Sequence, residues 1–220
     1  MYCGLAPEPA AAAYGVEKPD FLMTQMIKNL GYTFVGMSIL ALLLLNGMGV
    51  GKAIAWSAIP WVLNSLSSVW NGDGKKMGMT ENSEYLLLAI NAAVMYCGFT
   101  DTNADLAAKC YAGWTALNGV YMALSPAKGA EMWGVKTDAK TEAMMKNFGY
   151  SLASYAALVW FGNAGTEVTT AIGYSWCGML LSLVDGLYVS KSFDAMGSAK
   201  EPAYVWGVIQ LAVIAATLVE

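Results

Sequence analysis

The chain has 220 residues, of which 57% are hydrophobic and 13% are charged, and its mean hydropathy is +0.46. An ordinary soluble domain carries roughly a quarter charged residues, so this chain lacks the charge needed to cover itself in water. It has twelve lysines, no arginine and no histidine, and its net charge is −4. These features exclude haem with histidine ligands, the usual zinc sites and histidine-based catalysis, and they argue against a nucleic-acid partner. We therefore expect a membrane protein that is not an enzyme.

Seven apolar segments follow one another along the chain, and each approaches the roughly 20 residues that cross a bilayer. They cover residues 29–48, 53–70, 84–100, 107–124, 145–163, 168–190 and 203–219. The sequence thus predicts an all-α, polytopic integral membrane protein with about seven transmembrane helices.

The lysines fall on alternate connections between these segments. If all seven segments span, the N-terminal arm and every second connection share one side, and that side holds ten of the twelve lysines. The opposite side keeps Lys52 and Lys109. Lysine is enriched on the cytoplasmic side of membrane proteins. We therefore expect the N-terminus on the cytoplasmic or stromal side and Glu220 on the other side.

The sequence also repeats itself at an offset of 118 residues. Residues 28–33 (KNLGYT) recur as 146–151 (KNFGYS), and residues 53–57 (AIAWS) recur as 171–175 (AIGYS). One inserted residue later, Asn91 matches Gln210. These matches predict a 3+4 duplication, with a first repeat of residues 1–106 and a second repeat of residues 107–220. The two copies are expected to run parallel about a pseudo-two-fold axis along the membrane normal.

The first repeat lacks the helix that opens the second. It begins near residues 6–9 (APEP), which are followed by a run of alanines. Such a start is typical of an amino end from which a targeting or leading segment has been removed. A divergent copy that never had the helix would give the same sequence, so both origins remain open.

Four amide side chains lie at mid-helix depth, namely Asn64, Asn91, Asn118 and Gln210. An amide left unpaired in hydrocarbon is costly, so each must bond to another helix or to a ligand. The hydrogen bond between helices is the simpler interpretation. The alternative is that these amide oxygens bind the magnesium of a chlorophyll, beside aromatic walls that eight Trp and twelve Tyr could supply.

Asp185 is the one carboxylate that the sequence places well inside an apolar segment. A proton or ion pathway normally uses several ionisable groups within the membrane. The sequence offers one such group, and together with the duplication it keeps a small transporter as the alternative function.

The second half of the chain resembles the small four-helix membrane proteins of the DoxX-like kind. The residues that carry this resemblance are Ser125 and Pro126 at the end of a helix, residues 130–134 (AEMWG), and a lysine shortly before Gly149 and Tyr150. Lysine stands where such proteins often have arginine. The resemblance covers about half of the chain and recurs more weakly in the other half. It implies no catalytic residue, and as an alternative function it implies a component of a quinone-linked membrane oxidoreductase.

A looser likeness is to the accessory or linker subunits of algal photosystem–antenna supercomplexes. It is carried by the Ala- and Pro-rich start and by helices rich in Trp, Tyr, Met and Gly. The chlorophyll antenna family itself is rejected, because its paired Glu and Arg signature cannot occur in a chain without arginine. This likeness implies a non-catalytic linker subunit of the plastid thylakoid that contacts other membrane subunits, lipids and pigments. The pigments would be a few chlorophylls or carotenoids.

Overall fold

The structure, a computed structural model, describes residues 6–13, 16 and 19–218. Within these residues the chain is all-helical and has no strand. The long helices are α3 (Phe21–Leu45), α4 (Val50–Asn71), α6 (Glu81–Thr100), α7 (Ala104–Leu124), α9 (Ala139–Asn163), α10 (Val168–Val184) and α12 (Glu201–Leu218). A π-helical turn, η1 (Asp185–Val189), extends α10. The short helices are α2 (Pro7–Ala13), α5 (Asp73–Met77), α8 (Pro126–Met132) and α11 (Ser192–Met196).

Each apolar segment predicted from the sequence coincides with one long helix, and local capping explains where the bounds differ. Helix α3 begins two turns before its segment because the Asp20 side chain accepts a hydrogen bond from the Met23 backbone at 2.7 Å. The helix then ends before Gly47, which has a left-handed backbone at φ 76°. Helix α9 likewise begins at a capping box formed by Asp138 and Thr141. The hydrogen bonds from Thr141 also lower the pKa of Asp138.

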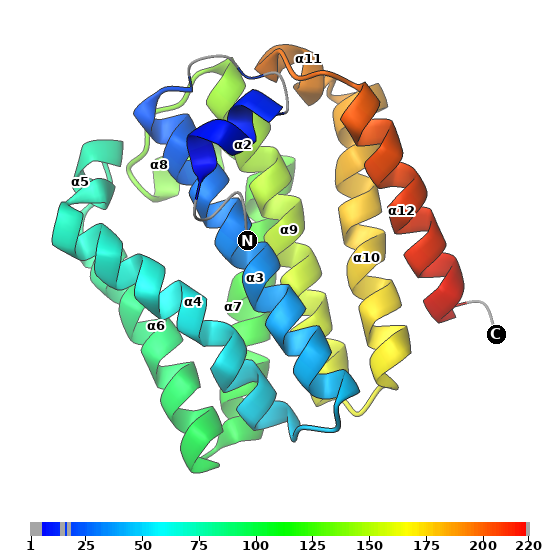
Figure 1. The fold of residues 1–220 in the computed structure, drawn as a ribbon. Coiled ribbons are helices and arrows are strands. Elements are labelled where there is room, and N and C mark those ends of the chain that lie inside the picture. The colour runs from blue at the N-terminus through cyan, green and yellow to red at the C-terminus, as the bar shows by residue number, and fades with distance from the viewer. Residues whose placement is uncertain (1–5, 14–15, 17–18, 219–220) are drawn as a thin grey trace.

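The long helices stand side by side and alternate in direction, so successive connections lie at opposite ends of the bundle (Figure 1). All four short helices gather at one end, which we call the short-helix end (Figure 1). Nine of the eleven lysines in the described residues lie at this end or within about two turns of it. Lys52 and Lys109 lie at the opposite end, and Lys18 falls outside the described residues.

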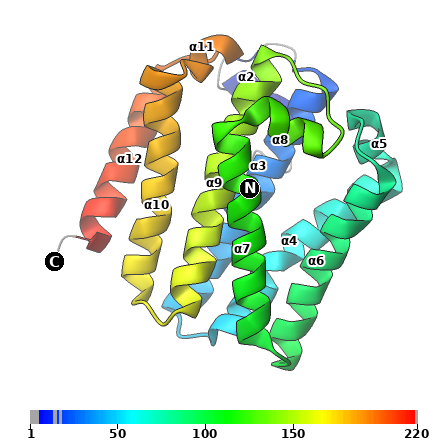
Figure 2. The same cartoon turned by 180° about the vertical axis from the view of Figure 1, so that it is seen from behind.

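Helix α9 occupies the middle of the bundle, where it contacts α3, α7 and α10 (Figure 2). Its residues Tyr155, Leu158 and Val159 are fully or almost fully buried. Helices α7 and α9 come especially close where Gly119 faces α9. A Cβ on Gly119 would lie 2.6 Å from the backbone nitrogen of Ala153, so only glycine permits this approach.

In the part of the chain that the structure describes, three helices are long and apolar enough to cross a membrane, namely α3, α10 together with η1, and α12. Large apolar side chains also point outward from the bundle. Trp70 is 90% exposed and Val208 is 67% exposed. A water-soluble protein rarely exposes large continuous apolar surfaces. Both features are compatible with a membrane protein.

The helix bounds recur along the chain at the offset seen in the sequence. Moving both bounds of α3 forward by 118 residues gives those of α9, and the same shift takes α4 onto α10 together with η1. A shift of 119 residues takes α2 onto α8 and α5 onto α11. The predicted boundary after residue 106 falls in the first turn of α7, and nothing in the fold tests it.

Candidate functional site: a cavity between five helices

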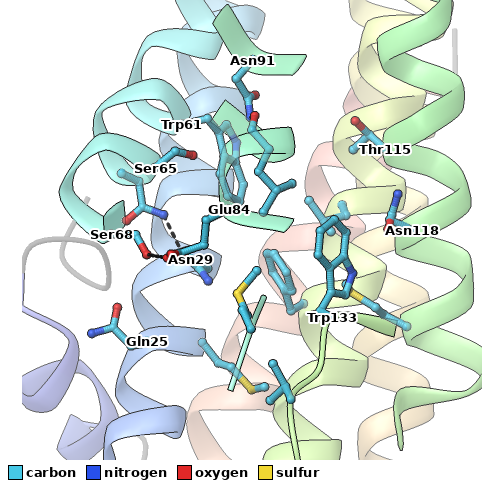
Figure 3. Close-up of a pocket in the computed structure, with 18 of the residues that line it drawn as sticks. Gln25, Asn29, Trp61, Ser65, Ser68, Glu84, Asn91, Thr115, Asn118 and Trp133 are labelled. Atoms are coloured by element: carbon cyan, nitrogen blue, oxygen red, sulfur yellow. Dashed lines mark hydrogen bonds between the residues drawn. The ribbon is translucent and has the colours of Figure 1, made fainter. Parts of the chain in front are cut away.

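A cavity of about 150 Å³ lies between α3, α4, α6, α7 and α9 (Figure 3). Residues from connections at the short-helix end, including Met79 and Val135, line it, so the cavity lies toward that end. Its walls are mostly apolar and include six aromatic side chains, namely Trp61, Tyr111, Trp114, Trp133, Phe148 and Tyr155. The long helices supply five of these rings, and Trp133 comes from the end of α8.

The structure brings three of the four predicted amides to this cavity. Asn64 of α4, Asn91 of α6 and Asn118 of α7 all line it. Gln210 lies elsewhere, on α12, where its Oε1 is buried and accepts no hydrogen bond from the described residues. The sequence pattern matched Asn91 with Gln210, but of these two residues Asn91 lines the cavity and Gln210 does not.

Two of these amides make the hydrogen bonds between helices that the simpler interpretation predicts. Asn64 Nδ2 donates to Asn29 Oδ1 at 2.7 Å and thereby joins α4 to α3. Tyr111 Oη donates to Asn91 Oδ1 at 3.0 Å and thereby joins α7 to α6. Asn118 instead donates to the Trp114 carbonyl of its own helix at 2.8 Å. Binding of pigment by any of the four amides stays a prediction.

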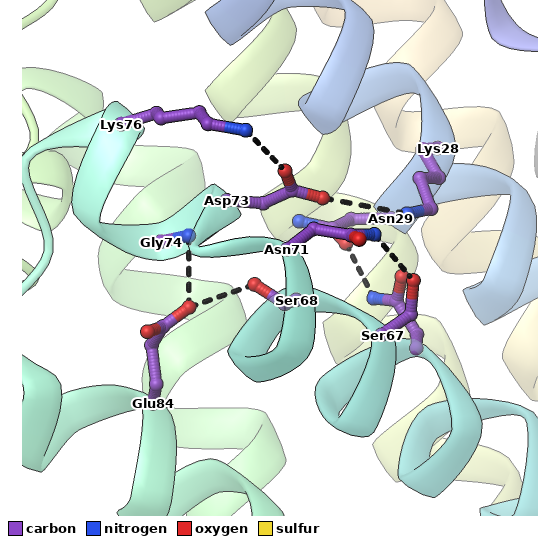
Figure 4. Close-up of polar contacts among 10 residues, drawn as sticks. Lys28, Asn29, Ser67, Ser68, Asn71, Asp73, Gly74, Lys76 and Glu84 are labelled. Atoms are coloured by element: carbon purple, nitrogen blue, oxygen red, sulfur yellow. Dashed lines mark hydrogen bonds and ion pairs between the residues drawn. The ribbon is translucent and has the colours of Figure 1, made fainter.

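Glu84 is the cavity residue that the sequence did not identify. It opens the third apolar segment, yet its carboxylate is buried and the residue is 9% exposed. Glu84 Oε1 accepts hydrogen bonds from Ser68 Oγ at 2.7 Å and from the Gly74 backbone at 2.8 Å (Figure 4). These bonds join α6 to α4 and α5.

The fold of α5 explains why Glu84 is buried. Residues 72–78 turn back over the start of α6, with left-handed backbones at Gly72 and Gly78. A Cβ on Gly74 would overlap the Glu84 carboxyl group, so glycine is needed there. The three glycines in this connection were the available sequence signal for such a close fold, but glycine spacing does not say which side chain it will cover.

An ion-pair cluster around the buried Asp73 lies on the other side of α5. Asp73 is 6% exposed, and its carboxylate faces Lys28 at 3.9 Å and Lys76 at 3.5 Å (Figure 4). Both lysines are therefore directed to Asp73. Among the residues that the structure describes, Glu84 has no ion-pair partner.

Asp185, the carboxylate singled out in the sequence, lies outside the cavity. Its Oδ2 forms an ion pair of 2.8 Å with Lys146 Nζ and accepts a hydrogen bond from Ser190 Oγ at 2.9 Å. Lys146 thus pairs the charge of Asp185, and Ser190 fills part of its hydrogen-bonding capacity. Asp185 is therefore a structural group at the end of α10.

Comparison of the chain with protein families, with curated proteins and with solved structures gave no match. In residues 6–13, 16 and 19–218, no three Cys, Asp or Glu side chains cluster as metal ligands.

Proposed function

We propose that the chain is an integral membrane protein with seven spans and with its N-terminus on the lysine-rich side, stromal or cytoplasmic. Three helices meet the length and composition of a span, and the other four long helices run alongside them in alternate directions. The collection of lysines at the short-helix end supports the orientation.

The same proposal includes the parallel 3+4 duplication of residues 1–106 and 107–220. The recurrence of helix bounds supports it, and so does a recurrent side-chain contact. Asn64 donates to Asn29 at 2.7 Å, and 118 residues later Ser182 donates to Asn147 at 3.1 Å. Both contacts join the same pair of helices within their unit, α4 to α3 and α10 to α9.

The function that we propose is that of a non-catalytic linker subunit in a large membrane complex, with an algal photosystem and its antenna in the thylakoid as the setting. The outward apolar surface carries this proposal. Helix α12 contacts its neighbours through few of its residues, and its outer face exposes Val205, Trp206, Val208 and Leu211. A helix with small and aromatic residues on an open apolar face suits contact with other membrane helices.

Chlorophyll or carotenoid, if held by this subunit, would lie against such outer faces. A dry cavity of roughly 150 Å³ accommodates a single benzene ring. The cavity beside Glu84 has this volume but is partly open, and binding of a pigment by Asn64, Asn91 or Asn118 stays a prediction.

Purification in a mild detergent tests the linker function. We expect the protein to carry a pigment absorption spectrum and to co-purify with photosystem or antenna subunits. A colourless, monodisperse protein without partners would contradict the proposal.

A small transporter, or a DoxX-like component of a quinone-linked oxidoreductase, is the second candidate. The observation that favours it is the cavity, which places a buried carboxylate among aromatic walls. The test is solute flux or redox activity in liposomes. This candidate expects the activity to disappear in Glu84→Gln, and activity unchanged in that variant would exclude a role for the cavity.

A further inference from the structure

We propose that the cavity beside Glu84 binds a small organic cation of the alkylammonium class. The linker function neither requires nor predicts such a site, so the two proposals stand or fall separately.

The first argument is the state of the Glu84 carboxylate. Both of its hydrogen bonds reach Oε1, from Ser68 Oγ and from the Gly74 backbone. Oε2 accepts no hydrogen bond from the described residues, and the atom retains some accessible surface. One oxygen thus joins α4, α5 and α6, and the other has no hydrogen-bond partner among the described residues, in a side chain that lines the cavity.

The second argument is the missing counter-ion. A charge taken out of water is normally paired, because burial without a partner is costly. Of the lysines on or facing α5, Lys28 and Lys76 pair with Asp73 on the far side of α5 (Figure 4). The exposed Lys75 makes no ion pair among the described residues. A cation bound in the cavity would supply the charge that the described residues do not.

The third argument is the chemistry of the walls. Aromatic faces attract cations, and cages of aromatic side chains are the usual sites for quaternary ammonium groups. Here Trp61 packs against Phe148 with ring centres 6.2 Å apart, and Trp114 packs against Trp133 at 6.3 Å. Both pairs line the cavity together with Glu84, and Figure 3 shows Trp61, Trp133 and Glu84 around it.

The size of the cavity limits the ligand. About 150 Å³ suits a group comparable with a benzene ring, such as a trimethylammonium head. The group could arrive as a free cation or as the headgroup of a lipid, since the cavity lies toward one end of the bundle.

Equilibrium binding of radiolabelled choline to the full-length protein in detergent tests this site. We expect saturable binding that weakens at least about tenfold in Glu84→Gln, because the amide loses the charge but keeps an oxygen for Ser68 and Gly74. The matched control is Glu81→Gln, which removes an exposed carboxylate from the same helix and should leave binding unchanged. The neutral alcohol in which a tert-butyl group replaces trimethylammonium should bind at least about tenfold more weakly than choline.

A second variant keeps the test meaningful if Glu84→Gln does not fold. Trp133→Leu removes an aromatic wall and should weaken choline binding, whereas Trp133→Phe should retain most of it. Adding phosphatidylcholine to the detergent separates the two sources of the cation. Competition with choline identifies a lipid headgroup, and no competition identifies a free cation. Absence of saturable choline binding, equal binding in Glu84→Gln, or equal affinity for the neutral alcohol would overturn the proposal.

Discussion

At the scale of single residues, amide and hydroxyl side chains hold neighbouring helices at fixed positions. Asn64 donates across to Asn29, whereas Asn118 bonds only to its own helix. Hydrogen bonds between membrane helices contribute about 1 kcal/mol each, because the alternative is a polar group without a partner in an apolar surrounding. The two asparagines therefore differ in their expected effect on stability although both line the cavity.

Replacing Asn64 by Ala should lower the free energy of unfolding in detergent by about 1 kcal/mol. Asn118→Ala serves as the control and should cost less, because no bond between helices is lost. A double-mutant cycle with Asn29→Ala should show coupling between residues 29 and 64. Strictly additive effects, or an equal loss in Asn118→Ala, would show that this bond does not stabilise the fold.

The ion pair of Lys146 and Asp185 has a similar structural role. The two side chains are 19% and 14% exposed, so removing one leaves a poorly hydrated charge. We expect Asp185→Asn to lower the free energy of unfolding by about 1–3 kcal/mol, and Lys146→Gln in the same chain to restore part of the loss. Denaturant unfolding of the two single variants and the double variant checks this. Asp185→Asn with unchanged stability would argue that the aspartate serves a function instead.

Some of the site residues could be identified from the sequence, because amides inside apolar segments need partners. For Asn64 and Asn91 the sequence left a bond to another helix and a bond to a ligand open, and the structure shows a bond to another helix for both. Glu84 could not be identified in the same way. Its burial depends on how α5 folds back over α6, and a carboxylate at the edge of an apolar segment is usually solvated.

At the scale of helices, glycines decide how closely α7 and α9 pack. A Cβ on Gly149 would lie 2.6 Å from the Gly119 carbonyl oxygen, so the two backbones meet at these glycines. Gly113, on the same helix as Gly119, has open space where a Cβ would be. Comparing an alanine substitution at Gly113 with one at Gly149 thus separates the effect of close packing from that of helix propensity.

Gly149→Ala should force α7 and α9 apart and lower the free energy of unfolding by roughly 1–3 kcal/mol, as overpacking does. Gly113→Ala should be neutral or stabilising, because alanine favours the helix and meets no neighbour. Thermal unfolding of both variants in the same detergent gives the comparison. Equal melting temperatures would mean that close packing at Gly149 is unimportant.

The long helices could be predicted from the length of the apolar segments, but the residues at which these helices begin could not. Helix α3 gains two turns that include Gln25 and Lys28, which a search for apolar segments leaves out. The short helices α5 and α11 also escaped notice. At five residues each, they are set by glycine caps and by packing at the bundle end, not by a periodic pattern.

At the scale of the whole molecule, alternating helix directions explain how lysines far apart in the sequence reach one end. The sequence predicted this distribution because connections alternate between ends in any bundle of spanning helices. The cavity was not predictable, since its walls combine five long helices with residues of α5, of the end of α8 and of two connections, and no local pattern specifies that combination. The membrane-spanning topology is the part of this picture that depends on helix length and lysine placement together.

Side-specific labelling of lysines in sealed vesicles tests that part most directly. Lys136 and Lys52 are both exposed and lie at opposite ends of the bundle. An amine reagent that cannot cross membranes should modify Lys136 from one side of the vesicle and Lys52 from the other, as mass spectrometry of the peptides would show. Modification of both lysines from the same side would contradict the seven-span topology and the orientation proposed for the chain.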